Sequence, residues 1–228
     1  MPLKQASKPH RGFLPMEGPI ARRYAALRRT DPQMALYRQQ AESLTAGLPE
    51  GAAVLEVAPG PGYLAIEMAR AGRARVVGLD ASATFVELAT TAARESGVGV
   101  EFRVGDAAGM PFDAASFDLV VSQAAFKNFA RPARALEEIH RVLRPGGTAI
   151  IQDMNREASS SDIAVEVKAM GLGRGSAAVT KLVLARLRRR AYSQAQFKQL
   201  VADSSFRTCE VTADGIGLEV RMSKPPVT

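Results

Sequence analysis

The chain has 228 residues, of which 46% are hydrophobic and 23% are charged, and its formal net charge at pH 7 is +7. This length allows one well-buried domain, and no apolar run reaches the length that a membrane-spanning helix needs. A single cysteine, Cys209, excludes an intrachain disulfide and fits a reducing compartment, so we expect a cytoplasmic protein. The positive charge alone does not indicate a nucleic-acid partner, because most basic residues are spread along the chain.

The first 47 residues precede the part of the chain with strand-like patterns. Residues 1–16 contain basic residues, no acidic residue and no apolar core of signal-peptide length, so we predict a flexible lead. Residues 17–47 have a helical pattern, in which Asp31-Pro32 supplies an N-cap and a first-turn proline for a second helix. We expect these helices to form an N-terminal cap over the ligand end of the domain.

From about residue 52, short β-rich runs alternate with segments of helical period. We predict helices over 63–71, around 85–92 and around 136–143, the last one closed by the stop signal Arg144-Pro-Gly-Gly147. Strands separated by helices indicate parallel pairing with right-handed crossovers, and ligands then bind at the carboxyl ends of the strands. The predicted strands of this part cover residues 53–57, 75–79, 101–104, 117–122 and 148–153.

The last third of the chain departs from this alternation. Two amphipathic helices fall within 161–190, and we interpret 156–191 as a helical cap inserted into a domain that runs from 48 to 228. A helix over 193–203 and strands near 208–213 and 216–223 follow, and Asp214-Gly215 between these strands predicts a hairpin turn. The predicted fold is therefore α/β and Rossmann-like: a doubly wound seven-stranded sheet, mostly parallel, with an antiparallel C-terminal hairpin and a helical cap.

A glycine-rich stretch after the first predicted strand has two interpretations. Gly60-Pro-Gly62-Tyr-Leu-Ala65, with Asp80 at the end of the second strand, is close to a dinucleotide-binding fingerprint. Shifted by one frame, Glu56-x-Ala58-x-Gly60-x-Gly62 looks like a loop for a different nucleotide. The glycines allow both, because each lets the backbone approach a ligand.

Five segments in order resemble the motifs of class I S-adenosylmethionine (SAM)-dependent methyltransferases, in particular those of ubiquinone and menaquinone biosynthesis. They are VLEVAPGPG, VVGLDAS, GDAAGMPF, FDLVVSQAAF and RVLRPGGTAII. The resemblance implies SAM as the cofactor and S-adenosylhomocysteine as the product. It implies that Glu56 orders the loop, Asp80 accepts hydrogen bonds from the ribose, and Asp106 binds the adenine amino group. The implied cofactor-binding residues are Glu56, Ala58, Gly60, Gly62, Asp80, Ala81, Asp106, Ala107 and Gln123.

Ala58 departs from the family pattern, which has glycine at this position. Pro59 and Pro61 flank Gly60, so we expect a stiff loop, because proline fixes φ near −65°. Alanine is acceptable at position 58 only if its φ is negative. The geometry of the loop is therefore open at this stage, while the implied cofactor is not affected.

No strong catalytic motif is present, which suits a methyl transfer driven by alignment of the reactants. Tyr24, Tyr37 and His10 are weak candidates for a general base, and no metal-binding pattern is found. We predict a small-molecule acceptor in an apolar pocket under the cap, with Phe126, Asn128 and Phe129 on its wall; whether O, C, N or S is methylated stays open.

Two alternatives remain at this stage. The basic run Arg186–Arg190 keeps an RNA or protein methyltransferase under consideration, although nucleic acid is the less favoured partner. The second alternative is a SAM-binding protein without turnover. We expect a monomer or a homodimer.

Overall fold

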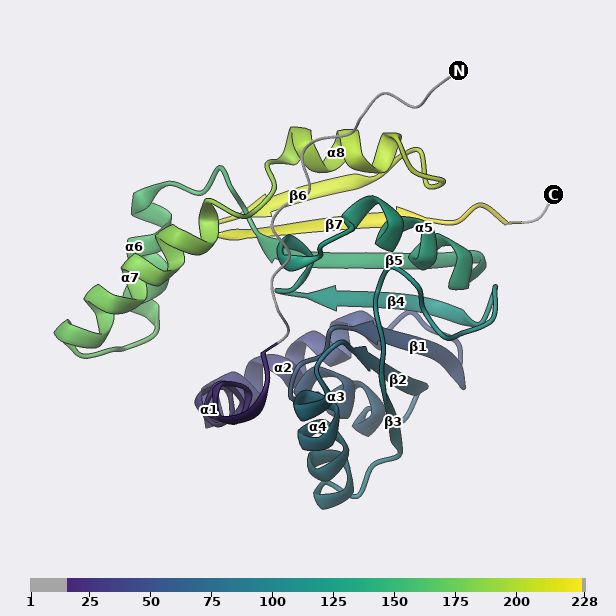
Figure 1. Cartoon of the computed structure of the whole chain (residues 1–228), viewed down its shortest axis with the longest axis horizontal. Helices are drawn as coiled ribbons and strands as arrows, with labels where there is room; N and C mark the ends of the chain where they lie inside the picture. The colour runs from purple at the N-terminus through teal and green to yellow at the C-terminus, as the bar shows by residue number, and fades with distance from the viewer. Residues whose placement is uncertain (1–15, 227–228) are drawn as a thin grey trace.

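A computed structural model describes residues 16–226 and arranges them around one seven-stranded sheet (Figure 1). The strand order is β3-β2-β1-β4-β5-β7-β6. Pairing is parallel from β3 to β5 and antiparallel from β5 through β7 to β6, which confirms the predicted fold class. The strands are β1 (Ala52–Val57), β2 (Ala74–Asp80), β3 (Val100–Val104), β4 (Phe117–Gln123), β5 (Leu143–Met154), β6 (Glu210–Asp214) and β7 (Gly217–Ser223).

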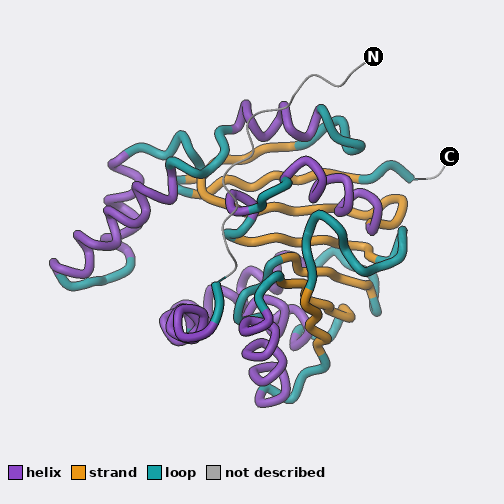
Figure 2. Tube along the Cα trace, viewed as in Figure 1, coloured by secondary structure: helices purple, strands orange, loops and turns teal. Residues whose placement is uncertain are grey.

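Helices cover both faces of this sheet, as the tube view shows (Figure 2). The helix pair α2–α3 packs on one face, and α5 and α8 pack together on the other. The helices are α1 (Gly18–Arg28), α2 (Asp31–Thr45), α3 (Tyr63–Arg70), α4 (Ala83–Glu95), α5 (Pro132–Val142), α6 (Ser160–Ala169), α7 (Arg174–Arg188) and α8 (Gln194–Ala202), with a 3-10 turn, η1, at Phe126–Asn128. Of the predicted flexible lead, only Met16 lies within the described residues.

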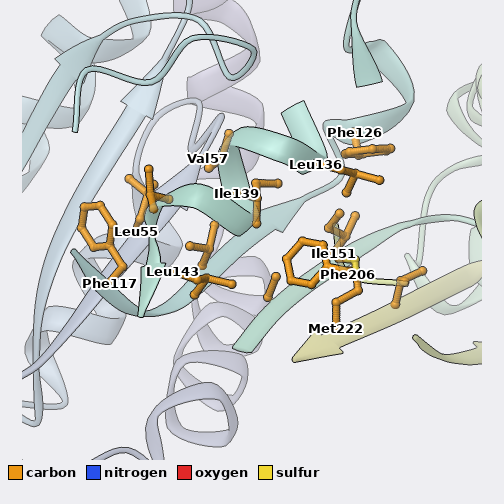
Figure 3. Packing of buried hydrophobic residues seen from close by; sticks show 14 of the residues in the cluster. Leu55, Val57, Phe117, Phe126, Leu136, Ile139, Leu143, Ile151, Phe206 and Met222 are labelled. Atoms are coloured by element: carbon orange, nitrogen blue, oxygen red, sulfur yellow. The ribbon is translucent and has the colours of Figure 1, made fainter. Parts of the chain in front are cut away.

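The larger hydrophobic core lies between the sheet and α5 (Figure 3). Leu136 and Ile139, one turn apart on α5, are fully buried against Leu55 and Ile151 of the strands. This spacing is the helical periodicity from which α5 was predicted. Phe126 is also fully buried here, with its ring centroid 4.9 Å from that of Phe197.

One predicted boundary was wrong. The helix ends at Val142, and Leu143 is the first residue of β5, so Arg144-Pro-Gly-Gly147 lies inside this strand. The register of β5 against β4 shifts at this point, between Phe117 and Leu119. Gly146 has φ of 81°, and proline has no N–H for the ladder, so the segment forms an irregularity in the strand.

Helix α1 is attached to the amino end of α4. The Glu17 carboxylate accepts hydrogen bonds from the backbone N–H groups of Ala83 and Thr84, 2.9 and 3.1 Å away. The Ser82 hydroxyl donates to the carbonyl of Met16 at 2.6 Å. These bonds satisfy free N–H groups at the start of α4 and hold α1 beside the carboxyl end of β2.

Candidate functional site

A cavity of about 190 Å³ lies where the loops after β1 and β4 diverge. The strand order reverses between these two strands, and open α/β sheets bind ligands at such a switch point. Helices α1 and α2 supply the opposite wall. The lining residues include Met16, Tyr24, Arg28, Tyr37, Glu56, Ala58, Pro59, Gly60, Tyr63, Asp80, Ala81, Phe85, Gln123, Ala124, Asn128 and Phe129.

Glu56 is the most unusual polar residue of this cavity. It is buried, with 3% of its surface exposed, and its Oε2 atom has no hydrogen-bond partner among residues 16–226. Burial, together with the nearby Asp80 carboxylate, raises the pKa of Glu56 to about 8, although the backbone amide of Ala65 acts in the opposite direction. A buried carboxyl oxygen without a hydrogen-bond partner is costly, so the Oε2 atom of Glu56 fits a site that receives a cation or a donor.

Asp80, at the end of β2, holds the glycine loop, residues 58–62 after β1. Its Oδ2 atom accepts a hydrogen bond from the Gly60 N–H at 2.9 Å, and its Oδ1 atom accepts one from the Ser82 N–H at 2.8 Å. Burial raises the pKa of Asp80, although the Ser82 and Gly60 amides act against this rise. Gly62 follows with φ of 77°, and a Cβ there would lie 2.7 Å from Ala89 and from the Phe102 ring. Only glycine fits at position 62 without displacing α4 or β3.

Ala58 does not meet the condition of a negative φ that an unstrained alanine requires. Its φ is 59°, in the left-handed region where the related motif has glycine. Ala124, which follows β4, has φ of 56°. Both residues line the cavity, so two of the four non-glycine residues with positive φ in the described part of the chain are at this site. Such strain persists only where the surrounding structure fixes the backbone, and it is concentrated at binding sites.

Replacing Ala58 by glycine should raise the free energy of unfolding by about 0.5–1 kcal/mol, because glycine adopts this φ without steric strain. Urea denaturation of both proteins measures the difference. Ala71→Gly is the matched control: Ala71 is the C-cap residue of α3 with φ of −60°, so the same substitution should give no gain there. A stability loss in Ala58→Gly would contradict the strain.

Two of the three candidate bases line the cavity, and the third, His10, is outside the described residues. Burial raises the pKa of Tyr37 to about 12, so its phenol is protonated at neutral pH and acts as a hydrogen-bond donor instead of a base. Tyr24 receives a hydrogen bond from Arg28 Nε at 3.2 Å, and the Arg28 guanidinium lies 5.4 Å from the centre of its ring. Tyr24 and Tyr37 therefore surround the Arg28 guanidinium as groups that can orient a ligand.

A second cavity adjoins the first and shares Arg28, Gln123 and Ala124 with it. Gln123 Nε2 donates to the side-chain oxygens of Gln40 and Gln152, each 3.1 Å away, and these amides link α2 to β4 and β5. The wall also contains apolar side chains, so it is mixed rather than uniformly apolar. These apolar residues are Met154, Met170, Leu184, Leu187, Ile216 and Leu218.

Three predicted site residues lie away from the first cavity. The Asp106 carboxylate accepts a hydrogen bond from the Ala108 N–H at 2.8 Å and forms an ion pair with Arg131 at 2.7 Å. Ala107 packs against the edge of the larger core, and Phe126 lies inside it. The other predicted residues after β1, β2 and β4 meet at the cavity, apart from Gly62, which caps α3 beside it.

Residues 55–151 match a family model described as a methyltransferase domain. Over this segment, called the methyltransferase domain from here on, the chain is similar to that family. It is 38% identical over 107 residues to a demethylmenaquinone methyltransferase of Deinococcus radiodurans, covering 46% of this chain and 44% of the relative. A ubiquinone biosynthesis O-methyltransferase of a Chelativorans strain is 34% identical over 137 residues, covering 59% and 54%. The chain thus spans about half the length of these relatives.

The same fold occurs in a SAM-dependent methyltransferase of Aquifex aeolicus. The TM-score is 0.63 at 20% sequence identity, and the match covers 89% of this chain and 96% of that one. At this identity the likeness concerns the fold only. It covers more of the chain than residues 55–151.

The methyltransferase domain supplies Glu56, the glycine loop and the segment after β4, which are the parts that sequence motifs revealed. Residues outside this domain complete the cavity, and sequence reasoning missed Arg28 among them. The sequence offers only a weak indication of Arg28: Tyr24 lies one helical turn earlier, a spacing at which side chains interact. Phe85 of α4 was likewise not predicted as a site residue, yet it lines the cavity, and its ring contacts Tyr24 edge-on with the ring centroids 5.8 Å apart.

Proposed function

We propose that this protein transfers a methyl group from SAM to a small-molecule acceptor. The observation that carries the proposal is the buried Glu56 carboxyl group at the switch point of the sheet, whose Oε2 atom has no hydrogen-bond partner among residues 16–226. SAM is a cation with a positively charged amino group on its methionine tail, and a carboxylate in a low-dielectric wall attracts such a ligand. A dinucleotide carries a negative pyrophosphate, which would repel the ionised form of Glu56 instead of stabilising it.

Each end of such a ligand has a partner in the first cavity. Glu56 and the backbone around Ala58 and Gly60 face the methionine tail, and Asp80, with its unused lone pairs, receives the ribose hydroxyls beside Ala81. Asp106 and Ala107 remain our predicted adenine contacts; Asp106 reaches the base once its exposed ion pair with Arg131 opens. When bound, SAM supplies a methyl group on a sulfonium leaving group.

The acceptor is proposed to enter the second cavity, because it adjoins the first at Arg28, Gln123 and Ala124. Its mixed wall suits a small molecule that has an apolar body and a few polar groups. Asn128 and Phe129 would border the acceptor from the side of η1. The names of the two quinone-biosynthesis relatives support an acceptor of that type. The residues of this chain would orient the acceptor and exclude water, which accounts for much of the acceleration in an in-line displacement.

Titration calorimetry should detect binding of SAM and S-adenosylhomocysteine and no binding of NAD. Transfer of a labelled methyl group to a metabolite extract then identifies the acceptor, with a demethylated quinone precursor as the first pure compound to try. Tight NAD binding would refute the assignment of the first cavity. Binding of SAM without transfer to any compound would refute turnover while leaving the cofactor site intact.

A further inference from the structure

Helices α6 and α7 form an arm, residues 160–190, that projects beyond the sheet (Figure 1). The inner side of the arm packs on the domain through a small cluster that contains Met154, Ile163, Val167 and Ala191. Helix α7 has no buried residue along its 15 residues. The arm therefore has a second, outer side that the rest of the described chain does not cover.

This outer side is strongly apolar. Val179, Leu182 and Val183 lie on one stripe of α7 with exposed fractions of 63%, 73% and 49%. Met170 and Leu172 are exposed at the turn between the helices. Together with Val165 of α6, the arm holds six of the ten large exposed hydrophobic side chains in residues 16–226. An apolar surface of this kind marks an interaction site.

The arm is also strongly basic. It contains seven basic and two acidic residues, a net charge of +5 in a chain of +7. Lys168 and Arg174 flank the apolar turn, and Arg186 follows Leu182 by one helical turn. Within the described residues, no ion pair involves Lys168, Arg174, Lys181, Arg186 or Arg189.

We propose that the arm docks on a lipid bilayer that contains anionic lipids, with its aliphatic side chains among the acyl chains and its cations at the headgroups. Amphipathic helices bind membrane surfaces through this combination of apolar area and attraction to anionic lipids. No described helix is long and apolar enough to cross a membrane, so the contact is with the surface.

Two other occupants of the outer side of the arm, a second copy of the chain and a nucleic acid, fit this surface less well. A second copy of the chain on the same face would bring two arms of +5 together, and like charges at an interface oppose association. A nucleic acid would neutralise the cations but leave the six aliphatic side chains without an apolar partner. The arm also contains no aromatic residue on which a base could stack.

Docking has a consequence for the second cavity. Met170, Leu184 and Leu187 of the arm form part of its wall, so a docked arm places this cavity beside the lipid. The arm can bind lipid whether or not the protein transfers methyl groups, so this inference goes beyond the proposed function and does not depend on it.

Co-sedimentation of the 228-residue chain with vesicles tests the proposal. Vesicles of phosphatidylcholine with added phosphatidylglycerol should bind the protein about tenfold more strongly than phosphatidylcholine alone, and added salt should weaken this binding. Val179→Glu should lower the binding about tenfold, because it puts a charge on the apolar stripe. Val104→Glu is the matched control, since Val104 is similarly exposed, at 54%, and lies on β3 away from the arm.

Equal binding to both kinds of vesicle, or equal loss in Val179→Glu and Val104→Glu, would overturn the proposal. A salt-sensitive gel shift with RNA in a protein that does not sediment with vesicles would assign the arm to nucleic acid instead. A dimer in light scattering that Val179→Glu dissociates would assign the face to a second copy. Calorimetry with SAM on Val179→Glu should be unchanged, which separates failure of the arm from failure of the cofactor site.

Discussion

Replacing Asp80 by alanine should weaken the binding of S-adenosylhomocysteine by about tenfold to a hundredfold, because charged hydrogen bonds are each worth about 1.5–3 kcal/mol. In the described structure the carboxylate holds the Gly60 and Ser82 amides, so the substitution releases the glycine loop as well as the proposed ribose contact. Asp80→Asn keeps one carbonyl oxygen as an acceptor and should give a smaller loss. Titration calorimetry on the folded variants measures both.

Asp118→Ala is the matched control for Asp80→Ala. Asp118 accepts a hydrogen bond from the Ala53 N–H at 2.7 Å and pairs with Arg144 at 2.6 Å, at the opposite end of the strands. Both substitutions remove a carboxylate that holds the backbone, but only Asp80 lies at the cavity. Equal loss of ligand affinity in the two variants would mean that the effect comes from general destabilisation, and an unchanged affinity in Asp80→Ala would place the ribose elsewhere.

The sheet could be predicted from local pattern because its signals are local. Leu136 and Ile139 repeat at helical spacing, and Asp214-Gly215 marks the turn between β6 and β7. The error at Leu143 arose where a strand begins without any intervening loop, since Arg144-Pro-Gly-Gly147 has the composition of a stop signal in either setting. Turn residues indicate an irregular backbone but do not say whether it lies outside a strand or within one.

The site was predictable only where the sheet itself places the residues. Glu56, Asp80 and Gln123 each lie near the carboxyl end of a parallel strand, so the sheet itself brings these residues of the motifs to the cavity. Arg28 reaches the cavity because α1 is attached to α4, a contact between residues more than sixty positions apart that no local pattern contains. The φ of Ala58 is likewise set by its surroundings, against its intrinsic preference.

Glu56 should make the ligand-free protein less stable as the pH rises from about 5 to 8. The pKa of Glu56 is about 8 in the folded protein because of its burial and the neighbouring Asp80, whereas the unfolded chain has the ordinary value of 4.5. Between these values the folded state binds more protons than the unfolded state, so stability falls with rising pH, by up to about 1.4 kcal/mol per pH unit. The fall ends above the folded pKa, where both states are ionised.

Glu56→Gln should abolish this slope, because the amide has nearly the same shape and does not ionise. Urea denaturation of both proteins across this pH range gives the difference in unfolding free energy, in which the contributions of all other groups cancel. Glu138→Gln is the matched control: Glu138 is also buried, but its hydrogen bonds to Arg141 lower its pKa. The Glu138 carboxylate stabilises the folded state above pH 4.5, and this stabilisation is lost in acid. The difference in unfolding free energy between Glu138→Gln and the wild type should therefore be constant from pH 5 to 8. A constant difference for Glu56→Gln as well would contradict the raised pKa.

The same carboxylate should link SAM binding to pH. A cation beside Glu56 favours its ionised form, so binding near neutral pH should release a proton, and affinity should rise with pH until about 8. Calorimetry in buffers of different ionisation enthalpy counts the released protons. In Glu56→Gln the release should disappear and the affinity should no longer depend on pH over this range. Proton uptake on binding to the wild type would show that the cationic end of the ligand lies away from Glu56.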